Sequence, residues 1–246
     1  MSIDPRLVER RREVAEDRAR RKVGRLVRVL IALGLAGAVA WLLLSPLLSI
    51  EEVATTGIAV SSAHSVLVEH GIVAGTPMIL IRAGEIETAL GSDPWVREAH
   101  LELEWPNRVV VRVEERVPTA WVETGGGWAA YAVDGVLLSS APEPDATMPW
   151  IHLGTVAPSE TRSSQVVLGS LEFVTGLSAG LRNGARVRVE TSGELWAEVA
   201  GFQVRLGRAV EMRAKALSLT ALILQQPAPG STLTLIAPTH PAISPP

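Results

Sequence analysis

The feature that most constrains this chain is one hydrophobic run near its N-terminus, which extends over residues 29–48 with the sequence VLIALGLAGAVAWLLLSPLL. The run contains 20 residues and no charge. A helix needs roughly 20 such residues to cross a hydrocarbon layer about 30 Å thick. The sequence therefore predicts a transmembrane helix at residues 29–48.

Charge is distributed unequally around this run. Residues 1–28 carry ten Arg and Lys against five Asp and Glu, which leaves 13 basic and 21 acidic residues for the rest of the chain. Positive charge that flanks a first helix favours the cytoplasmic side. We expect a basic cytoplasmic tail at residues 1–28, a single membrane pass, and extracytoplasmic domains after it. The segment Ala38-Val39-Ala40 resembles a signal-peptidase site, but the apolar run continues beyond it, so a retained anchor is favoured over a cleaved signal peptide.

The composition excludes several functional classes. The chain has no cysteine, so disulfides, thiolate metal sites and cysteine nucleophiles are excluded. The part after the run is acidic, which argues against nucleic acid as a partner because no basic face would contact phosphates. The five histidines are scattered, and no Ser-x-x-Lys or Gly-x-Ser-x-Gly motif occurs. We therefore expect no catalytic residue, metal or cofactor.

Residues 49–117 show a compact pattern of mixed elements. A short strand at residues 50–53 is followed by helices at residues 63–70 and 84–91. Two strands follow, and Pro106-Asn107 separates them as a turn. The first alternates apolar and polar residues over 99–105, and in the second Val109, Val111 and Val113 alternate with Val110, Arg112 and Glu114. The predicted order is strand–helix–helix–strand–strand, with the core formed by Leu101, Leu103 and Val111.

Residues 118–237 are predicted to form a β-rich domain with helices packed on its sheet. Strands are expected at 120–122, 128–133 and 136–138, and three more form a meander at 186–190, 195–199 and 203–206. Helices are expected at 165–181 and 209–226, a last strand at 232–237, and a Pro-rich tail at 238–246. The fold class is therefore α+β. The tryptophans in and beside these strands are expected mostly to pack in the core.

Three motifs occur in order along this layout. They are Asp93-Pro94-Trp95-Val96-Arg97-Glu98-Ala99, then Glu104-Trp105-Pro106-Asn107-Arg108-Val109, then Val113-Glu114-Glu115-Arg116-Val117-Pro118-Thr119-Ala120-Trp121. The turn Asp134-Gly135 and the segment Leu206-Gly207-Arg208 follow them. With these motifs behind one transmembrane helix, the chain resembles the FtsQ/DivIB family of bacterial cell-division proteins.

The resemblance implies that residues 49–117 form a POTRA domain and residues 118–237 an FtsQ-type β domain. It also implies a non-enzymatic scaffold of the divisome, located in the cell membrane at the septum, that links early and late division proteins and helps regulate septal wall synthesis. The implied partners are coiled-coil division proteins like FtsB and FtsL, together with other divisome membrane proteins.

A sheet edge is the predicted place for such a partner. The expected last strand is apolar on one face, and Pro238 follows it, so no later strand is expected to cover its edge. The resemblance points to the same region and to the helix before it. The predicted partner-binding residues are Thr232, Leu233, Thr234, Leu235 and Ile236, with Arg213 and Leu217 as helix neighbours.

Two other functions are weighed against this one. One is a cell-wall-binding or peptidoglycan-active protein. An enzyme of this class would need a polar pocket with a nucleophile or a metal. A POTRA protein of outer-membrane export would need several POTRA repeats and a barrel of alternating strands about ten residues long. The sequence offers neither of these, so the division scaffold is favoured.

Overall fold

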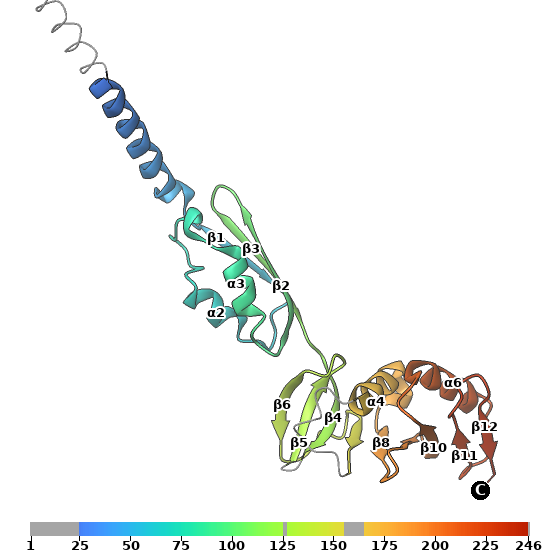
Figure 1. Ribbon diagram of the computed structural model, residues 1–246. Helices are drawn as coiled ribbons and strands as arrows, with labels where there is room; N and C mark the ends of the chain where they lie inside the picture. Colours follow the sequence, from blue (N-terminus) through green and yellow to red (C-terminus); the bar gives the residue numbers. More distant parts are fainter. Residues whose placement is uncertain (1–24, 125–126, 155–164, 246) are drawn as a thin grey trace, which may run out of the picture. The chain divides into compact units, whose positions relative to one another are not determined.

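The computed structural model describes residues 25–124, 127–154 and 165–245 (Figure 1). Most of the predicted basic tail at residues 1–28 lies outside this part of the chain. The described chain divides into two compact units. The first holds Met1–Ile58, Ser62–Leu90 and Ala99–Val113, and the second holds Ala59–Ser61, Gly91–Glu98 and Glu114–Pro246. Each unit is described separately.

The predicted apolar run is helical at its N-terminal side. The helix extends over Arg25–Leu43, which is 19 residues, and an 18-residue window within it has a mean hydropathy of 2.3, enough by length and composition to cross a membrane. The helix ends before residue 48, where the prediction placed its end, because Pro46 lacks an N–H and disfavours helical backbone in the residue before it. A short 3₁₀ helix, η1 (Pro46–Leu48), follows.

The remainder of the first unit has the predicted order of elements. Strand β1 (Glu52–Thr56) leads to helix α2 (Ala63–Glu69), the 3₁₀ helix η2 (Met78–Leu80), helix α3 (Ala83–Leu90), and strands β2 (Val96–Glu104) and β3 (Arg108–Glu115). The sheet order is β1-β3-β2, and β1 pairs with β3 in parallel. A β-α-α-β-β order with both helices on one small sheet is the POTRA architecture that was predicted.

The β2–β3 hairpin shows why the alternation was informative. The turn falls on residues 105–107, as predicted. Leu101 and Val111 are buried, whereas Glu102 on the opposite face of β2 is exposed and pairs with Arg112 at 2.8 Å. Leu103 is only half-buried, because it lies next to the turn that closes the hairpin, so the prediction that Leu103 belongs to the core is wrong.

The second unit contains a nine-stranded sheet with the order β12-β11-β10-β9-β8-β7-β4-β5-β6. Its first half consists of β4 (Pro118–Thr124), β5 (Gly127–Ala132), β6 (Leu137–Ala141) and β7 (Trp150–His152). The second half consists of β8 (Arg186–Val189), β9 (Leu195–Val199), β10 (Phe202–Gly207), β11 (Thr232–Thr234) and β12 (Ala242–Ser244). The predicted meander is β8-β9-β10, which pairs antiparallel throughout.

The described residues of this unit form three helices, namely α4 (Gln165–Gly176), α5 (Ala179–Arg182) and α6 (Met212–Leu224). Helices α4 and α6 lie side by side on one face of the sheet (Figure 1). Their close contact depends on small residues: a Cβ added to Gly169 would lie 2.9 Å from the Cβ of Ala209, and one added to Gly176 would lie 2.9 Å from the Cβ of Ala216. The main core fills the space between these helices and the sheet. The α+β fold class is confirmed.

Candidate functional site

The predicted partner site lies at one end of the nine-stranded sheet. Strand β11 covers only Thr232–Thr234 and pairs in parallel with β10. Its other edge pairs antiparallel with β12, in the register Thr232↔Ser244, Leu233↔Ile243 and Thr234↔Ala242. The expectation that no later strand covers β11 is therefore wrong. The outermost described strand at this end of the sheet is β12.

The predicted residues of the last strand are not all surface groups. Leu233 and Leu235 are fully buried in the main core, and the Leu235 N–H donates to the Arg205 carbonyl at 2.8 Å. Ile236 is half-exposed and faces Gly207. Only Thr232, Thr234 and Ile236 leave part of their surface accessible, so side-chain contact with a partner would fall to these three.

The other two predicted partner-binding residues, Arg213 and Leu217, lie on helix α6. They line a shallow hollow together with Val133 and residues of α4 that include Thr175 and Gly176. The structure therefore places these two predicted neighbours beside α4 and separates them from the strand with which they were grouped. The link between α6 and the segment after β11 comes from Ser218, whose Oγ donates to the Pro238 carbonyl at 2.8 Å.

A buried lysine fixes the C-terminal end of β10 beneath α6. The Nζ of Lys215 donates to the Leu206 carbonyl at 2.7 Å and to the Arg208 carbonyl at 2.8 Å. Burial lowers the pKa of Lys215, and the nearby charge of Glu211 acts against that shift. Lys215 is thus a structural residue of the Leu-Gly-Arg segment, a function that the sequence did not indicate.

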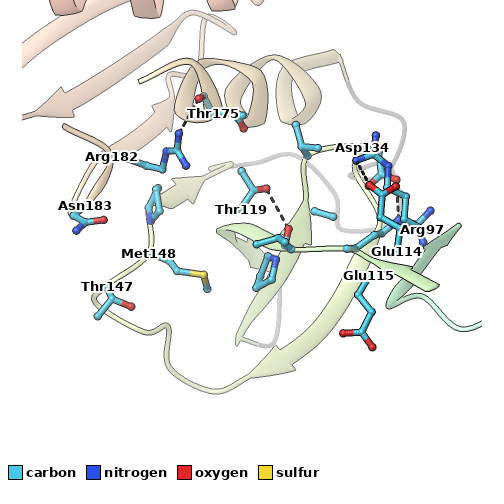
Figure 2. Close-up of a pocket in the computed structure, with 16 residues that line it drawn as sticks. Arg97, Glu114, Glu115, Thr119, Asp134, Thr147, Met148, Thr175, Arg182 and Asn183 are labelled. Carbon is cyan, nitrogen blue, oxygen red and sulfur yellow. Dashed lines mark hydrogen bonds and ion pairs between the residues drawn. The ribbon is translucent and has the colours of Figure 1, made fainter. Parts of the chain in front are cut away.

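A hollow of about 390 Å³ lies in the second unit between the start of β4 and the segment around α5 (Figure 2). Figure 2 shows Arg182 and Asn183 on one side of the hollow and Arg97, Glu114 and Asp134 on the other. Apolar side chains also line the hollow, among them Met148 and Pro118.

The charged groups on the Asp134 side neutralise one another. The Nη1 of Arg97 lies 3.3 Å from the Oε1 of Glu114. The Nε of Arg116 donates to the Oδ2 of Asp134 at 2.8 Å, and its Nη1 donates to the carbonyls of Pro94 and Val96. Arg116 therefore joins three segments that are far apart in the sequence. Burial acts to raise the pKa of Asp134, but the hydrogen bond and charge of Arg116, together with backbone hydrogen bonds, outweigh it, and the pKa lies below its ordinary value.

Glu115 anchors a fourth segment. Its Oε1 accepts hydrogen bonds from the N–H groups of Ala59, Val60 and Ser61 at 3.1, 3.1 and 2.8 Å. Partial burial acts to raise the pKa of Glu115, but the hydrogen bonds from Ser61, Ala59 and Val60 together lower it. In Figure 2 the carboxylate points away from the ion pairs around Asp134. Glu115 and Arg116 thus hold the chain together around the start of β4 and are not poised to react.

The remaining cation of the hollow is Arg182. Its Nη2 donates to the Thr175 and Leu177 carbonyls at 2.9 and 3.1 Å, which satisfies carbonyls at the end of α4. Within residues 25–124, 127–154 and 165–245, no group of three or more His, Asp or Glu is placed to hold a metal ion. The geometry of the hollow is that of a packed junction, since Arg97 and Arg116 are paired with Glu114 and Asp134 and Arg182 is bonded to backbone carbonyls.

Tryptophans mark the face of the sheet that the helices leave uncovered. Trp128, Trp150 and Trp196 are half-buried and alternate along their strands with residues of the main core such as Ile151 and Ala197. The rings of Trp128 and Trp150 have centroids 5.6 Å apart, and the guanidinium of Arg186 lies 5.1 Å from the Trp150 ring centre. The expectation that tryptophans pack mostly in the core holds for Trp121, which is buried, but not for this row or for the exposed Trp105.

Comparison with known proteins gives a consistent result. The POTRA domain family of the FtsQ type matches residues 48–116. The cell division protein FtsQ of Mycobacterium leprae is 27% identical over 207 residues, which cover 82% of this chain and 58% of the relative. FtsQ of Mycolicibacterium smegmatis is 26% identical over 222 residues, covering 89% of this chain and 62% of the relative.

A Streptomyces relative matches more evenly. The cell division protein FtsQ of Streptomyces bingchenggensis is 26% identical over 229 residues, which cover 88% of this chain and 86% of that protein. The chain thus spans about three fifths of the length of the two mycobacterial relatives and most of the Streptomyces one. The similarity extends well beyond residues 48–116, since it covers more than four fifths of this chain.

Proposed function

The chain belongs to the FtsQ/DivIB family of bacterial cell-division proteins, and from that premise we propose that it is a non-enzymatic, membrane-anchored scaffold of the divisome. In this proposal it links early and late division proteins at the septum and helps regulate septal wall synthesis. The observation that carries the proposal is the match to relatives named cell division protein FtsQ over more than four fifths of the chain. The paired charges of the hollow support a binding role over a catalytic one.

The proposed topology places the N-terminus in the cytoplasm and both structural units outside. Its support is the excess of Arg and Lys before the Arg25–Leu43 helix and the acidic balance after it. A reporter that is active only in the cytoplasm, joined after Pro246, should be inactive in growing cells. Activity of that reporter would contradict the orientation.

The proposed partners are small coiled-coil division proteins like FtsB and FtsL. We place their contact at the end of the sheet formed by β11 and β12, with Thr232, Thr234 and Ile236 from the predicted site. Because β12 occupies the edge of β11, an incoming strand would pair with β12 or would replace it. Arg213 and Leu217, which lie beside α4, would form a separate part of the contact.

Photo-crosslinking tests this placement with a matched control in the same sheet. Ile243 on β12 is 42% exposed, and Leu137 on β6, at the opposite end of the sheet order, is 40% exposed. A photoreactive amino acid at position 243 should crosslink to a small coiled-coil membrane protein in dividing cells, and one at position 137 should not. Crosslinking from position 137 alone, or from neither position, would contradict the proposed site.

The uncovered face of the sheet favours a second candidate, a cell-wall-binding protein. The half-buried row of Trp128, Trp150 and Trp196 offers planar rings beside arginines, a combination that is frequent at binding hot spots. Co-sedimentation of the full chain with purified peptidoglycan sacculi tests this function. Binding that is lost in Trp150→Ala would favour it, whereas the scaffold alone predicts no sedimentation.

A further inference from the structure

The membrane-proximal end of the POTRA unit exposes apolar side chains directly after the Arg25–Leu43 helix. Leu44 and Leu47 are exposed, and Leu47 has 70% of its surface accessible. The segment from Val29 to Ile50 contains no charged residue, so the apolar character of the helix continues through η1. Trp41, an exposed residue near the end of the helix, is the type that gathers at membrane interfaces.

A second uncharged segment lies at residues 71–81, with the sequence GIVAGTPMILI. Its 3₁₀ helix η2 is anchored by Met78, which is fully buried. The next two side chains point outward: Ile79 is 49% exposed and Leu80 is 62% exposed. Two large aliphatic residues in succession at a surface are unusual where only water covers them.

Backbone hydrogen bonds tie these two segments together. Ser49 and Pro77 form an antiparallel bridge. The Ile50 N–H donates to the Thr76 carbonyl at 2.8 Å, and the Gly75 N–H donates to the Ile50 carbonyl at 2.8 Å. Ser49 is linked back to the helix end, because its Oγ donates to the Ser45 carbonyl at 3.1 Å. The η2 segment is therefore fixed only a few residues from the point where the helix ends.

We propose that η1 and η2 form a membrane-contact surface, defined by Leu44, Leu47, Ile79 and Leu80, that enters the headgroup region of the leaflet where the helix ends. The occupant is phospholipid. The surface continues an apolar helix that is long enough to span the bilayer, and charged residues follow both segments at once, at Glu51 and at Arg82. Apolar side chains bordered by charged ones suit an interface about 5–10 Å deep.

This surface gives the POTRA unit a second attachment to the membrane besides its helix. A single helix with a flexible exit would let the unit tilt freely, whereas two attached segments restrict its tilt relative to the bilayer. The inference goes beyond the scaffold function and does not depend on any division partner. It rests only on the Arg25–Leu43 helix spanning a membrane.

Single-cysteine labelling tests the contact, because the chain has no cysteine of its own. The full chain is reconstituted into vesicles of phosphatidylethanolamine and phosphatidylglycerol, with an environment-sensitive fluorophore at one position. The test variant is Ile79→Cys, and the matched control is Val68→Cys on α2, because the two parent residues are 49% and 50% exposed. Leu35→Cys in the middle of the helix is the positive control. Quenching is measured with nitroxide-labelled lipids and with aqueous iodide.

The proposal predicts that a label at position 79 is quenched by nitroxide lipids and is several-fold less accessible to iodide than a label at position 68. No division protein is present in these vesicles, so protection from iodide must come from lipid. Equal iodide quenching at positions 79 and 68 would overturn the inference, including the case in which a protein covers this surface in cells. Absence of lipid quenching at position 35 would show that the helix does not span, and the inference would fail with it. The proposed division function would be unaffected by failure at position 79 alone.

Discussion

Replacement of Arg116 by alanine is the sharpest test of how the second unit is held together. Arg116 is 17% exposed and pairs with Asp134, and it also donates to the carbonyls of Pro94 and Val96. Arg116→Ala would leave these acceptors without their charged donor. It should therefore loosen the segment around residues 94–97 and the turn at Asp134 together.

The expected loss of stability in Arg116→Ala depends on how exposed Arg116 and Asp134 are and on the charge of the hydrogen bonds that are lost. A hydrogen bond to a charged group contributes about 1.5–3 kcal/mol, and removal of one partner of a buried pair costs more than that. Asp134 is 39% exposed and can regain water, so its part of the loss is small. We expect Arg116→Ala to lower the free energy of unfolding by about 2–4 kcal/mol. Arg116→Lys should lower the free energy of unfolding by roughly half as much, because lysine keeps the positive charge but lacks the planar guanidinium with its several N–H donors.

The matched control is Arg97→Ala, since Arg97 and Glu114 form an ion pair in the same hollow with both side chains more than half exposed. Such a pair contributes about 0–1 kcal/mol. The assay is denaturant unfolding of the full chain in detergent, followed by tryptophan fluorescence, with hydrogen exchange at residues 94–97 as the local readout. Exchange there should accelerate about tenfold or more in Arg116→Ala. Equal losses in the Arg116 and Arg97 variants would refute this account of the junction.

The same junction predicts a dependence on pH. The pKa values of Asp134 and Glu115 lie below their ordinary values in the folded chain. The unfolded chain therefore binds more protons as the pH falls, so the stabilisation is complete above the ordinary values of about 4 and is lost as the pH falls through the folded ones. The stability difference between the parent chain and Asp134→Asn should shrink from about pH 7 to about pH 3. A difference that stays constant would contradict the lowered pKa of Asp134.

Three further substitutions, two of them with a matched control, are tested by thermal unfolding of the full chain. Gly176→Ala should destabilise by about 1–3 kcal/mol, because its Cβ would lie 2.9 Å from a side chain of α6; Gly180→Ala, which meets no atom within 4 Å, should change stability by less than about 0.5 kcal/mol. Lys215→Met should cost about 1–3 kcal/mol, because two carbonyls at the end of β10 lose their donor. Leu101→Ala should cost about 2–5 kcal/mol and Glu102→Ala less than about 1 kcal/mol, and equal effects would contradict the assigned faces of β2.

The POTRA unit was predictable because its signals are local. Strand β2 alternates apolar and polar residues from Ala99 to Glu104, β3 is rich in valine, and Pro106-Asn107 marks the turn between them. The exception is Leu103, where position near the end of the hairpin reduces burial that the alternation alone would predict. The alternation of apolar and polar residues predicts which face of the sheet a residue occupies. How deeply that residue is buried depends on the helices and loops that pack over that face.

Strands β7 and β12 could not be predicted in this way. Each has three residues, and β12 lies between Pro241 and Pro245, so the local sequence indicates a loop or a tail. Each becomes a strand because a partner strand is already in place: β7 lies between β4 and β8, and β12 pairs with β11. The missed β12 is what made the edge of β11 look free.

The motif residues show a similar limit. The sequence identified Glu115, Arg116 and Asp134 as parts of recurring motifs, but it did not indicate that they contact one another or the backbone at residues 59–61. Those contacts join residues up to 56 positions apart in the sequence, and only the tertiary fold brings them together. The same holds for Arg213 and Leu217, whose placement beside α4 depends on the rotation of α6 over the sheet.

The central claim, that the chain is a divisome scaffold, is tested most directly by depletion in its own bacterium with a fluorescent septal wall synthase as the readout. The account predicts long or branched cells without septa, in which early division proteins still form rings but the synthase no longer reaches them. Re-expression of the full chain should restore its recruitment. Normal septa, with the synthase at every ring after depletion, would contradict the claim.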